Sequence, residues 1–162
     1  MNGCPCGYYG DSKKECSCSD YEVKRYLNKI SGPLLDRIDI HLEVPRLEVE
    51  ELNNYKQGEK SSQIRKRVER AREIQKKRFE GEGISQNSQM TPSLIEKYIL
   101  LDKEARELLE KAISTLNLSA RAYDRILKLA RTIGDLAGKD IIGSQEIGEA
   151  IQYRSLDRKL SL

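Results

Sequence analysis

The sequence predicts a mainly α protein in which a C-terminal four-helix bundle follows an incomplete α/β unit and a long basic helix. Apolar residues recur at helical spacing through most of residues 61–151. A single segment, residues 38–44, alternates apolar and polar side chains like a strand. Charged residues make up 34% of the 162-residue chain, which has no tryptophan and one phenylalanine, so we expect a modest core.

Residues 1–45 are expected to form the incomplete α/β unit. Asp20 can cap a helix over residues 21–30, because a carboxylate can accept hydrogen bonds from free backbone N–H groups. Pro33 suits the first turn of a short second helix. The strand over residues 38–44 would follow. One strand cannot satisfy its own backbone donors and acceptors, so this unit resembles part of a larger sheet.

Residues 46–90 are expected to hold a polar connection and a long helix from Ser61 to Phe79. The helix has a narrow apolar stripe and a strongly basic surface. Clustered cations of this kind can neutralise phosphates and release counterions. The candidate nucleic-acid contacts are Arg65, Lys66, Arg70 and Lys77. The alternative is a solvated helix with internal ion pairs, which the absence of interleaved aromatic residues favours.

Residues 91–154 are expected to form the bundle, because four short amphipathic segments with short links pack in this way. Each segment begins with a residue type that caps helices. The four expected caps are Thr91, Asp102, Ser119 and Ser144. Gly134 is expected to weaken the last turns of the third helix. Residues 155–162 are expected to be a frayed tail.

Charge and hydropathy exclude few classes of function. The net charge is only +3, so the overall balance does not define a partner. The sequence has no apolar stretch of membrane-spanning length and no apolar core of a signal peptide at its N-terminus. We therefore expect a cytoplasmic protein with no membrane partner, whose thiols stay reduced.

All four cysteines lie in the first eighteen residues, as two C-x-C pairs. Four thiolates can bind a tetrahedral zinc ion, and the glycines between the pairs allow the chain to turn back. The metal-ligand candidates are Cys4, Cys6, Cys16 and Cys18. The alternative is a surface loop of four reduced cysteines that binds metal weakly or not at all.

Two arginines are candidate phosphate contacts. Arg37 follows the expected short helix, and a guanidinium held at such a corner can stabilise the charge that develops in phosphoryl transfer. Arg121 lies in the first turn of a helix, where phosphate is attracted, although most arginines at such positions are merely solvated. The sequence has no G-x-x-x-x-G-K-[ST] loop to hold a nucleotide. The single histidine, His41, is expected to be exposed or hydrogen-bonded.

Several long motifs resemble the magnesium-chelatase-like AAA+ ATPases of the ComM/YifB type. The matching segments are Asn2–Asp11, Cys16 with Cys18, Arg25–Asp39, Leu118–Leu127 and Ala150–Arg158. The chain looks like the C-terminal third of such a protein. The resemblance implies an AAA+ lid for residues 91–154 and the end of an AAA+ α/β core for residues 1–45. One departure is Gly3, where the family usually has proline.

The resemblance also implies roles for three residues. Asn2 aligns with the sensor 1 asparagine, which helps to place the attacking water. Arg37 aligns with the arginine finger, which reaches the nucleotide of an adjacent subunit in trans. Arg121 aligns with the sensor 2 arginine, which touches the γ-phosphate of ATP. Whether Arg121 acts in cis or in trans stays open.

The function implied by the resemblance is that of a ring-forming motor, expected to be a hexamer, which uses ATP and magnesium for DNA remodelling or branch migration in natural transformation. The alternative is a magnesium-chelatase-like or chaperone-like subunit that remodels a protein partner. The Walker A and Walker B residues of the family lie upstream of the matched segments. We therefore expect this chain alone to be monomeric and without ATPase activity.

Overall fold

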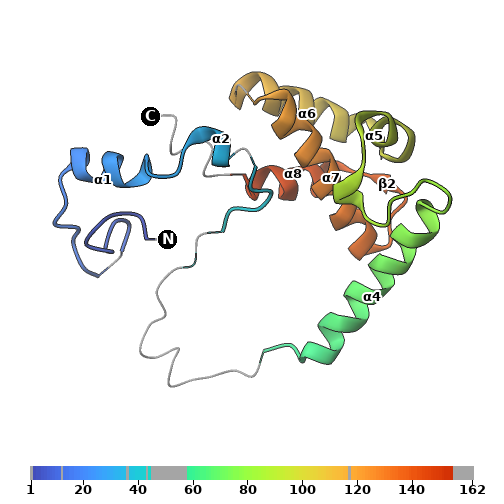
Figure 1. The fold of residues 1–162 in the computed structure, drawn as a ribbon, viewed down its shortest axis with the longest axis horizontal. Coiled ribbons are helices and arrows are strands. Elements are labelled where there is room, and N and C mark those ends of the chain that lie inside the picture. The colour runs from blue at the N-terminus through green and yellow to red at the C-terminus, as the bar shows by residue number, and fades with distance from the viewer. Residues whose placement is uncertain are drawn as a thin grey trace. The chain divides into compact units, whose positions relative to one another are not determined.

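The computed structural model describes residues 2–11, 13–35, 37–42, 44, 58–116 and 118–154. The described residues form two compact units, one up to Val44 and the other from Gly58 to Arg154 (Figure 1). They are mainly α-helical, as the sequence predicts. Among them, no helix is both long and apolar enough to cross a bilayer.

The N-terminal unit contains two short helices, of which the first, α1, spans Asp20–Leu27. The sequence suggested Asp20 as the cap of α1, but the cap is Ser19. The Ser19 hydroxyl accepts a hydrogen bond from the backbone N–H of Glu22, and the Glu22 carboxylate accepts one from the Ser19 backbone N–H at 2.8 Å. This reciprocal capping box satisfies two N–H groups that the helix leaves free, which explains why α1 begins here.

The second helix, α2, spans Gly32–Leu35 and confirms the short turn expected after Ser31. The strand predicted for residues 38–44 is wrong within the described part of that segment, where no strand forms and the four apolar side chains are exposed. These side chains are Ile38, Ile40, Leu42 and Val44. A strand needs a hydrogen-bonded neighbour, and pattern alone does not provide one. His41, in the same segment, is not exposed but buried.

The long helix α4 spans Ser61–Arg78, close to the predicted range. Its C-terminal half packs against the bundle, with Ala71 and Gln75 buried, whereas every residue of its first ten, 61–70, is exposed. After Phe79 the chain turns, and a short 3₁₀ helix, η1, spans Asn87–Gln89.

The remaining helices confirm the four-helix C-terminal bundle. They are α5 (Pro92–Tyr98), α6 (Lys103–Leu116), α7 (Ala120–Ala137) and α8 (Ser144–Gln152). Helix α7 is central and contacts α4, α5, α8 and η1 (Figure 1). The interior contains large apolar side chains that are almost or completely inaccessible to solvent, among them Leu109, Ile126, Ile142 and Ile147. Removing this apolar surface from water stabilises the bundle.

The helix starts follow local chemistry, with two corrections. Thr91 occupies the cap position of α5, but its side chain makes no capping hydrogen bond, and its hydroxyl instead bonds to the Ser93 hydroxyl at 2.9 Å. Asp102 and Ser119 cap α6 and α7 as predicted, since their side-chain oxygens accept from the backbone N–H of the third residue of each helix. Ser144 is not a cap but the first residue of α8. Its helix is capped at Gly143, whose N–H donates to the Glu146 carboxylate at 3.0 Å.

A two-stranded parallel sheet, which the sequence analysis did not predict, joins the ends of the bundle. Strand β1 (Leu100–Leu101) pairs with β2 (Ile141–Ile142). Gly134 on α7 faces β2, where an added Cβ would lie 2.5 Å from Ile142 Cδ1. Gly134 therefore allows close packing and does not end the helix, which continues to Ala137 and ends at Gly138 in a left-handed conformation.

The carboxylate of Asp135 on α7 is the centre of a buried polar network. Arg78 donates to both of its oxygens, Asn87 Nδ2 donates to Oδ2 at 2.7 Å, and Arg131 Nε donates to Oδ1 at 3.1 Å. Asp135, Arg131 and Asn87 are each at most 1% exposed. Arg131 also donates to the backbone carbonyls of Lys139 and Asp140. The network thus connects α4, η1, α7 and the loop before β2.

We expect Asp135→Asn to destabilise the chain by about 3–5 kcal/mol, because it leaves two largely buried guanidiniums without a compensating charge. The measurement is urea unfolding followed by circular dichroism. Glu110→Gln, which makes the same chemical change at an exposed position of α6, is the control and should shift stability by less than about 0.5 kcal/mol. A loss of less than about 1 kcal/mol in the free energy of unfolding of Asp135→Asn would contradict the stabilising role that we assign to the network.

Candidate metal centre and nucleotide-facing residues

The four cysteines lie together in the N-terminal unit. Their Sγ atoms all lie within 4.8 Å of one another. Cys4 and Cys6 are 3.3 Å apart, and Cys16 lies 3.6 Å from each of them. Tetrahedral zinc with Zn–S bonds of about 2.3 Å separates neighbouring sulfurs by about 3.8 Å. The cluster therefore has the dimensions of a four-thiolate metal site, and its thiols are free rather than joined as disulfides.

The loop between the two pairs has the sequence features that such a fold requires. Gly7 and Gly10 have φ angles of 85° and 81°, which side chains rarely allow. The Gly7 N–H donates to the Cys4 carbonyl at 3.2 Å, closing the first turn. Asp11 Oδ1 accepts from the backbone N–H groups of Lys13 and Lys14 at 2.9 and 3.0 Å, which stabilises the next turn.

The environment of the cluster favours one thiolate even before a metal is considered. Hydrogen bonds from the Tyr8 backbone N–H and the Cys4 thiol outweigh partial desolvation and lower the pKa of Cys6 to about 5. A Cys18 backbone hydrogen bond lowers the pKa of Cys16, but desolvation and the neighbouring thiols raise it to about 12. A bound divalent cation would deprotonate all four thiols, since its charge dominates the site.

Asn2, the first candidate nucleotide contact, lies at the start of this loop and is exposed. Its amide lies over Gly7, where an added Cβ would be 3.3 Å from Asn2 Nδ2. The next residue, Gly3, packs on the Tyr9 ring, and a Cβ there would be 3.2 Å from Tyr9 Cδ1. Sequence analysis identified Asn2 and the cysteines separately and missed the contact between Asn2 and Gly7.

Arg37 lies two residues after the end of α2 in the same unit. Its backbone N–H donates to the Leu34 carbonyl at 3.0 Å, and the next N–H donates to the Leu35 carbonyl at 2.9 Å. Leu35 is buried and anchors the turn, while Arg37 is exposed. The corner can therefore present a guanidinium to another molecule.

Arg121 lies in the C-terminal unit, in the first turn of α7. The Ser119 hydroxyl caps this turn by accepting from the Ala122 N–H at 3.2 Å. Ala122 and Ile126 are buried, whereas Arg121 is exposed and the first turn contains no acidic residue. The helix dipole and the guanidinium together favour an anion at this position.

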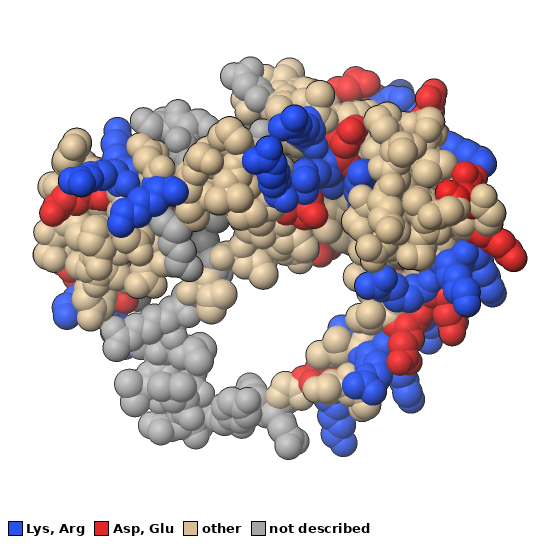
Figure 2. Space-filling model, viewed as in Figure 1, with Lys and Arg blue, Asp and Glu red and all other residues tan. Residues whose placement is uncertain are grey.

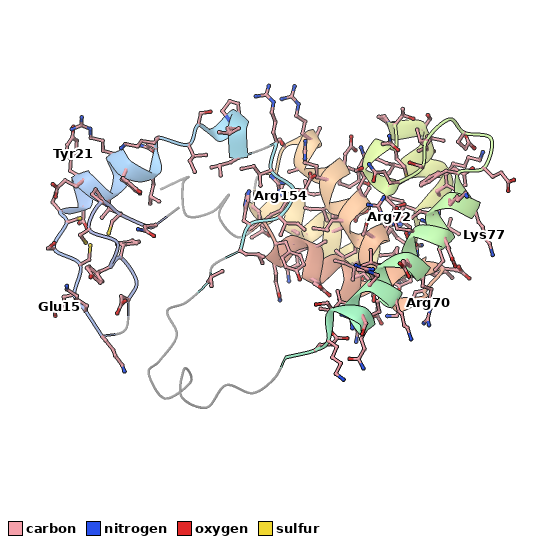
Figure 3. All side chains as sticks on the ribbon, turned by 60° about the horizontal axis from the view of Figure 1, so that its bottom comes forward. Glu15, Tyr21, Arg70, Arg72, Lys77 and Arg154 are labelled. Carbon is pink, nitrogen blue, oxygen red and sulfur yellow. The ribbon has the colours of Figure 1, made fainter. Side chains whose placement is uncertain are left out.

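The four candidate nucleic-acid contacts on α4 are all exposed but do not form one row. At 3.6 residues per turn, Lys66, Arg70 and Lys77 share one side of the helix, away from the buried Ala71, and Arg65 lies about a third of a turn from them. Figure 3 shows Arg70 and Lys77 on the outer side of α4. Figure 2 shows acidic side chains interleaved with the cations along this helix, so the surface is mixed in charge.

The buried groups around Asp135 were missed by sequence reasoning. Arg131 and Asp135 are spaced as an ordinary surface ion pair on one helix, so their spacing does not indicate burial. The available signal was their place among apolar residues of α7, next to the buried Gly134. These groups are structural and are not near the cysteine loop in the sequence.

Comparison with known proteins gives two family matches. A family described as magnesium chelatase, subunit ChlI C-terminal, matches residues 58–154, which is more than half of the chain. A second, described as magnesium chelatase, subunit ChlI, matches residues 1–52.

Individual relatives agree with this assignment. The chain is 40% identical over 161 residues to the competence protein ComM of Haemophilus influenzae, a match that covers 99% of this chain and 30% of that protein. It is 38% identical over 161 residues to YifB of Salmonella typhimurium, a match that covers 99% of this chain and 31% of that protein. An uncharacterized protein of Mycobacterium bovis is 34% identical over 153 residues, a match that covers 94% of this chain and 30% of that protein.

The chain thus spans about 30% of the length of the relatives that it matches. The matches follow the chain almost from end to end and include both units. The motifs that resemble the ComM/YifB type lie within the same alignable length. The chain belongs to the magnesium-chelatase-like AAA+ ATPase family and is of the ComM/YifB type.

Proposed function

We propose that this chain acts as the C-terminal part of a ring-forming AAA+ ATPase and supplies three groups to ATP hydrolysis. Arg37 is the arginine finger, Asn2 is sensor 1 and Arg121 is sensor 2. The observation that carries the proposal is the corner after α2, where a buried leucine holds the turn and the following arginine faces solvent. An exposed, positioned guanidinium suits a phosphate on a neighbouring molecule.

Each group has a distinct task in this proposal. Arg37 reaches the γ-phosphate of ATP in the adjacent subunit and stabilises charge on the transferred phosphoryl oxygens. The Asn2 amide orients the attacking water. Arg121 binds the γ-phosphate, aided by the N-terminus of α7. Magnesium would neutralise charge on the phosphates and would be held by residues outside this chain, whose sequence contains no G-x-x-x-x-G-K-[ST] loop.

We expect Arg37→Ala, in a longer protein that includes the ATP-binding residues, to lower kcat on the order of 10³-fold, because an arginine finger acts on the transition state. Lys13→Ala, an exposed position of the same unit, is the control and should leave kcat unchanged.

A mixture of two inactive variants tests whether Arg37 acts on ATP bound to an adjacent subunit. Arg37→Ala subunits are combined with subunits that have Arg37 but cannot bind ATP. Neither protein alone should turn over ATP, and the mixture should regain activity because the intact finger then faces a bound nucleotide. A fully active Arg37→Ala protein would refute the assignment.

We further propose that the parent protein remodels DNA and that the outer side of α4 contacts it. The relative from Haemophilus influenzae is named a competence protein, which agrees with a DNA substrate. Lys66, Arg70 and Lys77 share one solvent-facing side of the helix, a spacing that can follow a phosphate backbone. No described feature favours a protein substrate over DNA, and that alternative becomes an outcome of the test.

We expect the double variant Lys66→Glu/Lys77→Glu to weaken DNA binding and to reduce the slope of log K against log[salt] by about 2, one unit per lost phosphate contact. The control is Lys103→Glu/Lys111→Glu, which makes the same charge change on α6. Binding is measured by fluorescence anisotropy at several salt concentrations. Equal losses in both variants would show only a general charge effect, and no loss in either would favour protein remodelling.

We also propose that the cysteine cluster holds a structural zinc ion. The S–S distances of 3.3–3.6 Å support a shared ion, and four thiolates are a typical donor set for structural zinc. Such a site works in a reducing cytoplasm, which is the location we propose. Zinc would join the two ends of a loop that has little apolar core of its own.

We expect protein purified under reducing conditions to contain stoichiometric zinc by elemental analysis, and Cys6→Ser or Cys16→Ser to lose it. His41→Ala, the control, should keep the metal. Chelation should raise hydrogen exchange in the N-terminal unit and leave residues 91–150 protected, because the bundle has its own core. Zinc-free protein with unchanged exchange in both units would contradict the proposal.

A further inference from the structure

The cysteine loop brings the four sulfurs together and also forms the surface on which Asn2 lies. Among the described residues, chain neighbours aside, the atoms within 4 Å of an ideal Cβ at Gly7 both belong to the Asn2 side chain, Nδ2 at 3.3 Å and Cγ at 3.9 Å. The corresponding position at Gly3 lies 3.4 Å from the Tyr9 carbonyl oxygen and 3.2 Å from its ring. Residues 2–3 therefore lie against residues 7–9.

The metal-ligand candidates lie between these two contacts. Cys4 and Cys6 occupy the turn that carries the chain from Gly3 to Gly7, and Cys4 is completely buried. The Gly7 N–H donates to the Cys4 carbonyl at 3.2 Å, so the position of Gly7 is tied to that of the first ligand. Cys16 lies 3.6 Å from both sulfurs and closes the loop from the other end.

We infer that metal binding by the four cysteines positions the Asn2 amide, so that the metal site acts on nucleotide chemistry and not only on stability. An ion shared by all four sulfurs fixes Cys4 and Cys6, these fix Gly7, and Gly7 supports the Asn2 side chain. Because Asn2 is exposed, no buried environment holds its amide in one orientation, and support from the loop matters more. The link to catalysis rests on the proposed role of Asn2 as sensor 1.

Two glycines of the loop provide a matched pair of variants. Gly7 and Gly10 have nearly equal φ angles, 85° and 81°, so alanine introduces similar backbone strain at each. The methyl group at Gly7 would press on the Asn2 amide at 3.3 Å, whereas no atom of the described residues lies within 4 Å of the one at Gly10. A difference between the two variants thus reports the contact with Asn2 rather than the strain.

The positioning is tested on this 162-residue chain by following the Asn2 side-chain amide by NMR, with zinc alone as the probe. We expect one sharp Nδ2 resonance pair with zinc bound, and averaged or broadened signals after chelation. Gly7→Ala should shift this pair while zinc stays stoichiometric, and Gly10→Ala should leave it in place. Identical Asn2 signals before and after chelation, or equal responses to the two substitutions, would overturn the inference.

The chelation experiment uses the unmodified chain, so it shows whether the metal positions the Asn2 amide even if Gly7→Ala fails to fold. A second measurement addresses chemistry in a longer protein that binds ATP. There, Gly7→Ala should lower kcat about 10- to 100-fold with little change in KM, because a small misplacement of a positioning group is costly, and Gly10→Ala should stay near normal. Normal kcat despite a shifted Asn2 amide would overturn the sensor role, while the NMR result would still separately establish the positioning.

Discussion

The C-terminal unit depends on one buried carboxylate, that of Asp135. It accepts hydrogen bonds from Arg78 on α4, from Asn87 on η1 and from Arg131 on its own helix. Desolvation lowers the pKa of Arg131, and the charge of Asp135 opposes that shift. Because an unpaired charge in the interior is strongly destabilising, the elements that contribute these groups must pack together in the folded unit. Polar chemistry thus defines how α4 joins the bundle, and apolar packing fills the space around it.

The N-terminal unit is held together differently. Its described residues bury few apolar side chains, among them Val23 and Leu35, and its order relies on a capping box, tight turns and the cysteine cluster. Small units with thin cores commonly gain stability from bound metal. The same arrangement places an exposed amide and an exposed guanidinium, Asn2 and Arg37, on short, locally braced turns. Stability and proposed chemistry therefore depend on the same few backbone contacts.

The helices and their approximate starts were predicted from the sequence, although the caps of α1 and α8 were placed one residue late, and contacts between distant residues were not predicted. Ser119 was recognised as a cap because capping needs only residues of the next turn. Residues 38–44 alternate like a strand, yet pairing requires a partner that periodicity cannot reveal. Cysteine spacing predicted a cluster, since a nine-residue connection can turn back. The contact of Asn2 with Gly7 depends on the direction of that turn, and Asp135 has the spacing of a surface residue.

The uncovered first half of α4 has a mechanical consequence. Ten residues of continuous helix, 61–70, extend beyond the packed part of the unit, and at 1.5 Å per residue they form a stiff rod about 15 Å long. The rod continues into the packed half of α4, whose last residue, Arg78, is held by two hydrogen bonds to the Asp135 carboxylate. A force applied near Ser61 would therefore reach α7 as a tilt of the whole rod, with little absorbed by bending along the way.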